Sequence, residues 1–251
     1  MTDGDHGKAR RRGVKMRENN RKNDELREIS IEEDFITNQP ASLLYKQGNT
    51  RLICTAMYNE KVPFFAKTEK KGWISAEYSM LPGSTGKQRF LRERGGRMDK
   101  RNIEIQRFVG RSLRNIIDLK KIKDFNIFLD MDVVQAHGGT RCASVNGGVI
   151  ALMKMLKHLV FENKLFEVPP FEPFAAVSVG IKNGEILADI DFPEDSNIDA
   201  DMNIVSNGKG DIIEVTAFAE ESSVPKDLFF KAIDLGIEKN NEIIEIIKNY
   251  L

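Results

Sequence analysis

Cysteine and histidine are scarce in this chain of 251 residues, and long apolar runs are absent. The two cysteines, Cys54 and Cys142, lie among apolar or small residues, which argues against a disulfide framework and points to a reducing, cytoplasmic location. No apolar run reaches the roughly 18 residues of a membrane span, and the N-terminus has no apolar signal core. We therefore expect neither membrane insertion nor secretion. The three histidines occupy no triad-like setting, and His158 is expected on a helix surface.

Charge is unevenly distributed, although the formal net charge is zero. Residues 8–22 carry eight lysines and arginines and one acid, and residues 86–101 form a second basic stretch. Residues 189–201 carry six carboxylates and no lysine or arginine. Each run alone is typical of solvated surface. Together they suggest basic segments that attract a polyanion and carboxylates that hold a hard cation able to act on it.

Hydrophobic periodicity predicts an α+β fold with mixed or antiparallel sheets and packed helices. Gly48-Asn49 and Asn183-Gly184 are turn dipeptides between apolar runs, so each predicts a β-hairpin. In the helix predicted over 103–117, Ile103, Phe108, Leu113 and Ile116 should face inward. Residues 1–20 read as a basic mobile tail, and the rest of the chain can form one large domain or two small ones. The other predicted elements are strands over 72–81 and 125–134, a helix after Arg141, a hairpin over 202–219 and a C-terminal helix.

The stretch "QAHGGTRCASV", which begins at Gln135, joins a predicted apolar strand to a long apolar helix. A strand–Gly-Gly–helix junction leaves backbone N–H groups unpaired at the positive end of the helix dipole. The hydroxyl of Thr140 and the guanidinium of Arg141 add further donors, so the junction is a candidate phosphate site. Alternatively, glycine and threonine serve there only to cap the helix.

The acidic stretch "DIDFPEDSNIDAD" is a candidate metal site. Asp189 and Asp191 are expected on one face of a strand, with Asp195 and Asp201 in the loop beyond it. Such carboxylates can converge on Mg²⁺ and leave room for water and substrate phosphates. The alternative is an acidic surface loop.

Five motifs together resemble the bacterial ribonuclease PH family. They are "GWISAEYSMLPGST", "IEIQR", "DMDVVQAHGGTRCAS", "VSVGIKNG" and "DIDFPEDSNIDADMN", and they occur in the family's order. The resemblance covers nearly everything from about Asn20 to Leu251, and it implies a single catalytic domain over 21–251. The resemblance implies a ribonuclease PH-like fold and a phosphate-dependent nucleotidyltransferase, that is, a phosphorolytic 3′→5′ exoribonuclease. Such enzymes trim tRNA precursors with inorganic phosphate as co-substrate, and a role in rRNA processing goes with them. A divalent cation, Mg²⁺ or Mn²⁺, and a homohexamer built as a trimer of dimers are also implied.

The resemblance assigns roles to individual residues. Gly139, Thr140 and Arg141 match the phosphate-binding motif, and Arg101 matches a second phosphate-contacting arginine. Arg97, at the end of a "GGR" that precedes it, is a rival for that role. Asp195 and Asp201 match the catalytic, metal-binding aspartates, and Asp189 matches an acidic strand residue of less certain role. RNA is expected to contact Lys87, Arg89, Arg92 and Arg94.

Three departures from the family pattern stand out. His137 occupies a position that the family fills with Asp, beside the phosphate motif. Gly83 replaces an arginine, which shifts the basic residues to positions 87–94. "AFAEESS", from Ala217 to Ser223, replaces a smaller, glycine-containing segment.

Two alternatives remain on the sequence alone. One is an exosome-like ring subunit that binds RNA without catalysis. The four residues Arg101, Arg141, Asp195 and Asp201 argue against it, because a purely structural subunit needs none of them. The other is a plain RNA-binding module, which would leave the carboxylate cluster without a role.

Overall fold

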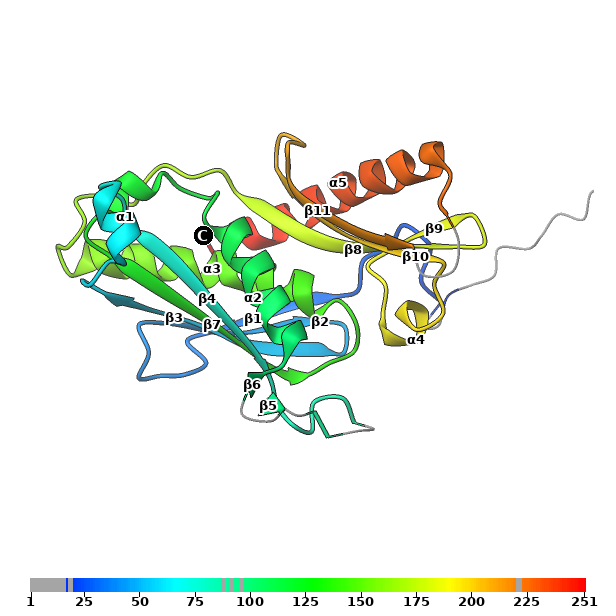
Figure 1. Ribbon diagram of the computed structural model, residues 1–251, viewed down its shortest axis with the longest axis horizontal. Helices are drawn as coiled ribbons and strands as arrows, with labels where there is room; N and C mark the ends of the chain where they lie inside the picture. The colour runs from blue at the N-terminus through cyan, green and yellow to red at the C-terminus, as the bar shows by residue number, and fades with distance from the viewer. Residues whose placement is uncertain (1–16, 18–19, 87–88, 91–92, 95–96, 220–222) are drawn as a thin grey trace, which may run out of the picture.

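Two large β-sheets, the helices that cover them and a small two-stranded hairpin make up the described part of the chain (Figure 1). The computed structural model describes residues 17, 20–86, 89–90, 93–94, 97–219 and 223–251. The strands are β1 (Ile29–Glu33), β2 (Ala41–Gln47), β3 (Thr50–Asn59), β4 (Trp73–Met80), β5 (Glu93–Arg94), β6 (Arg97–Met98), β7 (Asn126–Gln135), β8 (Phe174–Lys182), β9 (Glu185–Ala188), β10 (Ala200–Asn207) and β11 (Ile212–Ala219). The helices are α1 (Phe64–Thr68), α2 (Lys100–Leu113), the 3₁₀ turn η2 (Leu119–Ile122), α3 (Thr140–Phe161), α4 (Phe192–Asp195) and α5 (Lys226–Lys248).

The first sheet has the order β1-β2-β3-β7-β4, in which only the β4–β7 pair is parallel. Along β7 the residues Ile127, Leu129, Met131 and Val133 are buried, as the period-2 pattern predicts. The second sheet has the order β11-β10-β8-β9 and is antiparallel throughout. Both sheets therefore match the mixed and antiparallel expectation.

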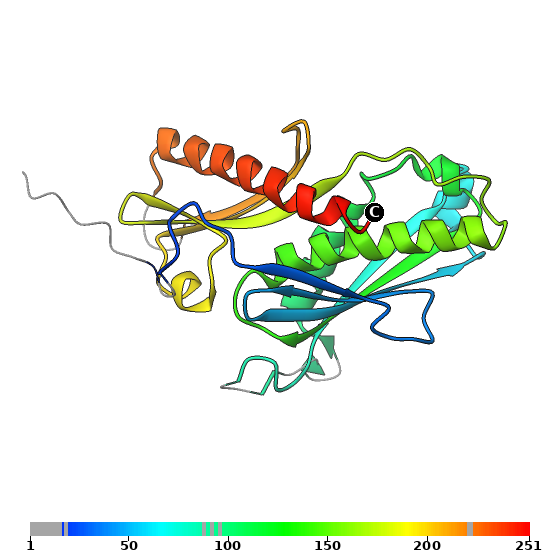
Figure 2. The ribbon, with the colours of Figure 1, turned by 180° about the vertical axis from the view of Figure 1, so that it is seen from behind.

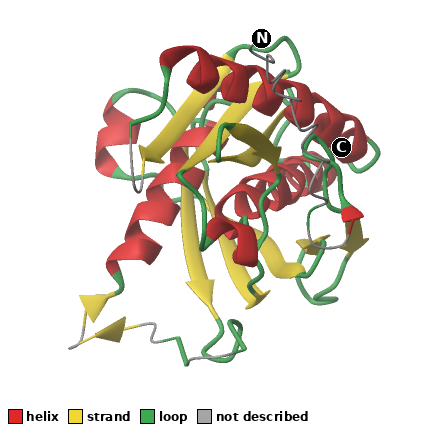
Figure 3. Ribbon diagram, turned by 90° about the vertical axis from the view of Figure 1, so that its right-hand side faces the viewer, coloured by secondary structure: helices red, strands yellow, loops and turns green. Residues whose placement is uncertain are grey.

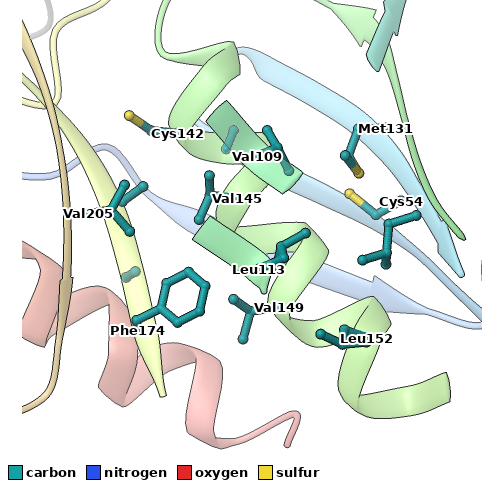
Figure 4. Close-up of a cluster of buried hydrophobic side chains, with 14 of the residues drawn as sticks. Cys54, Val109, Leu113, Met131, Cys142, Val145, Val149, Leu152, Phe174 and Val205 are labelled. Atoms are coloured by element: carbon teal, nitrogen blue, oxygen red, sulfur yellow. The ribbon is translucent and has the colours of Figure 1, made fainter. Parts of the chain in front are cut away.

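Helix α3 lies between the two sheets. It packs on β2, β3 and β7 of the first sheet and on β8 of the second, while α5 covers the other face of the second sheet (Figures 2 and 3). A helix that is apolar all round is one that is buried all round, and sixteen α3 residues are buried. Figure 4 shows Val145 and Val149 near Phe174 and Val205 of the second sheet, with Cys54 and Met131 belonging to the first. One core thus runs through both halves of the chain.

The local sequence signals are largely confirmed. Residues 48–49 and 183–184 do turn hairpins, and Asn183 and Gly184 both have positive φ, as the turn requires. The inward position predicted for Ile103 is wrong, because its side chain is 38% exposed, whereas Phe108 and Leu113 are buried. Ile116 is buried as well, but it lies beyond the end of α2.

The predicted tail falls mostly outside the described residues, so its mobility stays a prediction for 1–16, 18 and 19. Arg17 is described and is buried, and its Nη1 donates to the backbone oxygen of Ala188 at the end of β9. In the described part of the chain, no helix combines the length and apolar character needed to cross a bilayer.

Candidate functional site

The Gly-Gly-Thr-Arg junction begins α3 where the two sheets meet. Gly138 (φ 84°) and Gly139 (φ 67°) are both left-handed, a conformation that costs glycine little and other residues more. A Cβ on Gly138 would lie 2.6 Å from the backbone carbon of Asp191, so glycine there lets the acidic segment approach closely. The sequence motif and the acidic stretch, distant along the chain, are therefore in contact.

Arg141, in the first turn of α3, is held from the side of α2. Its Nη2 donates to Glu104 Oε1 at 2.7 Å, and its guanidinium lies 5.8 Å from the centre of the Phe108 ring. Its buried Nε has no hydrogen-bond partner among the described residues. A buried unpaired donor is costly unless something fills the position, and an oxyanion is the natural acceptor for a guanidinium.

Tyr78 on β4 is hydrogen-bonded to Thr140 and is influenced by the charge of Arg101. Its hydroxyl donates to Thr140 Oγ1 at 3.0 Å. Burial raises the pKa of that hydroxyl, while the positive charges of Arg101 and Arg141 act on it in the opposite direction. The two predicted phosphate arginines thus lie near one buried hydroxyl, at the start of α3 and the first turn of α2.

Cys142 indicates which charges surround the first turn of α3. The pKa of its thiol is raised to about 12, mainly by burial. Within that net shift the charges of Arg141 and Arg27 act to lower the pKa, and the charges of Asp189 and Asp201 act to raise it. Its Sγ donates to Asn203 Oδ1 on β10 at 3.3 Å. Asp201 lies two residues before Asn203 on β10, hence on the same face of the strand. The structure therefore brings Asp201 toward the Gly-Gly-Thr-Arg junction.

Arg27 ties the junction to the acidic segment. It donates from Nη2 to Asp189 Oδ1 at 2.6 Å and from Nε to Asp189 Oδ2 at 3.0 Å, and from Nη1 to the backbone oxygen of His137 at 3.0 Å. Asp189 is 1% exposed. Burial pushes the pKa of Asp189 up, but the charge and hydrogen bonds of Arg27 outweigh it, so that pKa lies below its usual range.

Asp191 and Glu194, two further carboxylates of the acidic segment, form the N-terminal cap of helix α4. Asp191 caps it by accepting from the Glu194 backbone N–H at 3.1 Å, and Glu194 closes the capping box. Glu194 also accepts from Arg17 Nε and Nη2, each at 2.5 Å, and pairs with Arg21 at 3.4 Å. Figure 2 shows the start of the described chain beside α4. Arg17, Arg21 and Arg27 thus hold the acidic segment in place.

The expected layout of the acidic stretch is wrong in two respects. Asp189 and Asp191 do not share a strand face: β9 ends at Ala188, Asp189 has φ +48°, and Asp191 caps α4. Asp195 and Asp201 do not lie in a loop, because Asp195 closes α4 and Asp201 belongs to β10. The pattern of alternating acids suggested a strand, but left-handed backbone at Asp189 and a capping box end it early.

The donor set fits Mg²⁺ only in an open arrangement. Within the described ranges, no three His, Cys, Asp or Glu side chains are grouped closely enough to hold a metal ion. Mg²⁺ commonly takes one or two carboxylates and fills its other positions with waters and substrate phosphates. Asp195 and Asp201 supply oxygens of the kind that this ion prefers.

Part of the expected RNA-contacting surface lies outside the described residues. This holds for Lys87 and Arg92, and for the side chains of Arg94 and Arg97, whose backbones form β5 and β6. Arg89 is exposed. Of the two arginines that compete for the second phosphate contact, only Arg101 has a described side chain, and its charge acts on Tyr78.

Sequence reasoning missed three residues of the site: Tyr78, Arg27 and Ser178. Tyr78 lies inside a quoted motif, but only the tertiary structure places its hydroxyl on Thr140. Arg27 pairs with a residue 162 positions away. Ser178 on β8 lies close to Gly139, and its buried Oγ has no hydrogen-bond partner among the described residues. The only local sequence signal for any of the three is the charge of Arg27, which stands shortly before the strand β1.

The Arg27–Asp189 pair gives a direct test of this packing. We expect Arg27→Gln to lower the free energy of unfolding by about 3–5 kcal/mol at pH 7, because it leaves a buried carboxylate unpaired. The pair's contribution is present above the ordinary carboxyl pKa of about 4 and is lost as pH falls through the lowered pKa of Asp189. The difference from the unsubstituted protein should therefore shrink in acid. Urea unfolding at pH 7 and below pH 4 measures it.

The control is Arg111→Gln, which breaks an exposed ion pair to Glu214. Exposed pairs contribute about 0–1 kcal/mol. A loss of stability at Arg27 no larger than that at Arg111 would contradict the role given to this pair.

The chain is similar to known proteins over most of its length. Residues 25–157 match the family described as "3′ exoribonuclease family, domain 1", and residues 172–239 match its domain 2. Proteins named ribonuclease PH are 44% identical in Hydrogenobaculum sp., covering 92% of this chain and 91% of the relative, and 42% identical in Moorella thermoacetica, covering 94% of each. The Bacillus pumilus protein of that name is 40% identical over 92% of this chain and 96% of its own.

Solved structures share the fold at lower identity. The Archaeoglobus fulgidus exosome with RNA bound to the active site has a TM-score of 0.77 at 22% identity, covering 92% of each chain. An archaeal exosome core has a TM-score of 0.74 at 21% identity, covering 92% of this chain and 91% of that one. These matches extend over both sheets and confirm the ribonuclease PH-like α+β fold. The chain belongs to the 3′ exoribonuclease family.

Proposed function

We propose that this protein is a phosphorolytic 3′→5′ exoribonuclease, a phosphate-dependent nucleotidyltransferase that trims the 3′ ends of tRNA precursors. Family membership and full-length similarity to ribonuclease PH proteins support the activity. The observation that carries it is the pair Thr140 and Arg141 at the start of α3, with Arg141 Nε left unpaired among the described residues, while Arg101 at the start of α2 acts with Arg141 on the Tyr78 hydroxyl that donates to Thr140. This is a basic anion site next to carboxylates.

The reaction needs such a site because phosphate is an anion that attacks another anion. One phosphate oxygen bonds to the phosphorus of the last phosphodiester, and the bond from that phosphorus to the 3′-oxygen of the preceding nucleotide breaks. The products are a nucleoside diphosphate and an RNA one nucleotide shorter, whose 3′-oxygen takes up a proton. Two guanidiniums and the N–H groups of α3 hold the attacking phosphate against charge repulsion. No side-chain nucleophile is required.

The carboxylates of Asp195 and Asp201 would hold Mg²⁺ or Mn²⁺ beside this anion site. When bound, the ion supplies positive charge that offsets negative charge on the scissile phosphate and the departing oxygen. Arg27 holds the neighbouring Asp189 against the phosphate junction, and the capping box of Asp191 and Glu194 fixes the start of α4.

Assembly, location and further substrates belong to the same proposal. A cytoplasmic homohexamer, a trimer of dimers, is the form that the family resemblance implies, with rRNA as a further substrate. Large apolar side chains on the described surface support assembly, since Phe64 is 86% exposed, Phe161 83% and Phe166 98%. Exposed apolar area of this kind commonly marks a protein interface.

The deciding experiment incubates the protein with a 3′-extended RNA and Mg²⁺, with and without inorganic phosphate. Nucleoside diphosphate that forms only with phosphate supports the proposal. Nucleoside monophosphate would instead indicate hydrolysis. RNA binding without any shortening would favour the non-catalytic ring subunit.

Basic residues of the N-terminal stretch should contribute to RNA affinity through counterion release. Deleting residues 1–16 removes five lysines and arginines and keeps Arg17, whose hydrogen bonds hold α4. We expect a shallower dependence of log affinity on log salt, by about 0.7 for every phosphate of single-stranded RNA that is no longer neutralised. Cleavage of a short oligonucleotide should persist. An unchanged salt slope would remove this stretch from RNA binding.

A further inference from the structure

A cavity of about 440 Å³ lies between α2 and β11, next to the phosphate junction. Its apolar lining is Ile103 and Phe108 from α2 and Phe218 from β11, and its charged lining includes Lys100 and Arg107. Glu104 also lines it and is the residue that pairs with Arg141. The volume lies in the usual range of small-molecule sites, about 300–1,000 Å³. The cavity and the candidate phosphate site therefore share a wall.

Phe218 is an unusual residue for its place. It belongs to the segment, Ala217–Ser223, that departs from the family's smaller, glycine-containing pattern. It pairs directly with Asp201 across β10 and β11, so the two side chains leave the sheet on the same face. Half of the side chain, 50%, remains exposed. Leaving a large aromatic side chain half in water beside a carboxylate gives the core little stabilisation.

The exposed Ile103 fits the same interpretation. A helix position predicted to face inward is instead 38% exposed and lines the cavity opposite β11. Two apolar surfaces therefore face each other across a gap that no described side chain closes. Around it, Lys100 and Arg107 form no ion pair with any described residue, whereas Arg111 is neutralised by Glu214.

We propose that this cavity binds the 3′-terminal nucleotide of the RNA, with its base stacked on Phe218. The inference rests on the proposed function and adds a base subsite to it. Inorganic phosphate held at Arg141 must touch the phosphorus of the terminal nucleotide, so that nucleotide's sugar and base lie within reach of the cavity wall formed by Glu104 and Phe108. Aromatic side chains stack on any base, because every base has a π-face. Lys100 and Arg107 complement the negative charge of the RNA backbone.

Stacking makes the subsite tolerant of sequence but sensitive to the presence of a base. The test compares two oligonucleotides that differ only in the last residue, one ending in adenosine and one ending in an abasic ribose. For the unsubstituted protein, loss of the base should lower kcat/KM for phosphorolysis roughly ten-fold. In Phe218→Ala the two oligonucleotides should be cleaved equally. Phe218→Tyr should restore the preference, since it keeps the ring.

Phe230→Ala is the matched control, because Phe230 on α5 is 51% exposed, much as Phe218 is, and does not line the cavity. It should keep the full base effect. A second readout needs no catalysis: binding of adenosine diphosphate, measured by calorimetry, should weaken roughly ten-fold in Phe218→Ala and not in Phe230→Ala.

The two readouts separate the two proposals. Phosphorolysis with an unchanged base effect in Phe218→Ala would overturn the base subsite and leave the proposed function standing. Diphosphate binding that depends on Phe218, in a protein that shortens no RNA, would retain the subsite and overturn the proposed function.

Discussion

Arg141→Lys should lower the rate of phosphorolysis by about 10²–10³-fold at fixed phosphate. Lysine keeps the positive charge but loses the planar fork that presents several donors to one oxyanion. In this structure the fork is divided: Nη2 is held by Glu104, and Nε has no partner among the described residues. A lysine ammonium cannot bond Glu104 and present a donor to the phosphate at the position of Arg141 Nε at the same time. Steady-state kinetics over a range of phosphate concentrations measures the reduction.

Arg114→Lys is the control, since Arg114 lies at the end of α2 opposite Arg101 and stacks 4.6 Å from the centre of the Trp73 ring. It should retain normal phosphate use. Normal turnover and normal phosphate saturation in Arg141→Lys would remove Arg141 from the anion site.

Asp201→Asn should abolish phosphorolysis and leave RNA binding intact or slightly tighter. The substitution removes an anionic oxygen that Mg²⁺ prefers, and it also relieves repulsion between the carboxylate and the RNA phosphates. Asp201 is only half-buried on β10, so the substitution does not disturb the packing of a fully buried side chain. Activity assays and RNA-binding titrations on the same preparation separate the two effects.

Partial recovery with excess Mg²⁺ or with Mn²⁺ would support a ligand role over a folding role. Asp234→Asn, on the exposed side of α5, is the matched control and should change stability by less than about 0.5 kcal/mol. Full activity in the Asp195→Asn, Asp201→Asn double variant would refute the metal assignment.

Local signals predicted most of the fold. The Asn183-Gly184 turn, the period-2 strand β7 and the apolar helix α3 each depend on neighbours in sequence, and each is confirmed. Ile103 was misplaced because helical periodicity assumes that an apolar residue meets a neighbouring element. Here a cavity separates Ile103 from the neighbouring strand β11.

The candidate site was predictable in its motifs but not in its connections. Thr140 and Arg141 could be singled out from sequence because the phosphate motif is continuous. The Arg27–Asp189 pair spans 162 positions, and its energy depends on burial that no sequence window reveals. The acidic stretch gave a charge pattern but not the capping box, in which Asp191 and Glu194 take a structural role at the start of α4.

The position of the junction at the start of α3 has a consequence for how activity is lost. Many proteins keep their binding residues in segments that open easily, at little cost in free energy. Here Thr140 and Arg141, which are proposed to hold phosphate, begin α3, a helix that packs on both sheets. Displacing that helix means separating two layers of core, so an opening large enough to spoil the anion site should cost nearly as much free energy as complete unfolding. We therefore expect the amides in the body of α3 to fall in the slowest class in hydrogen exchange.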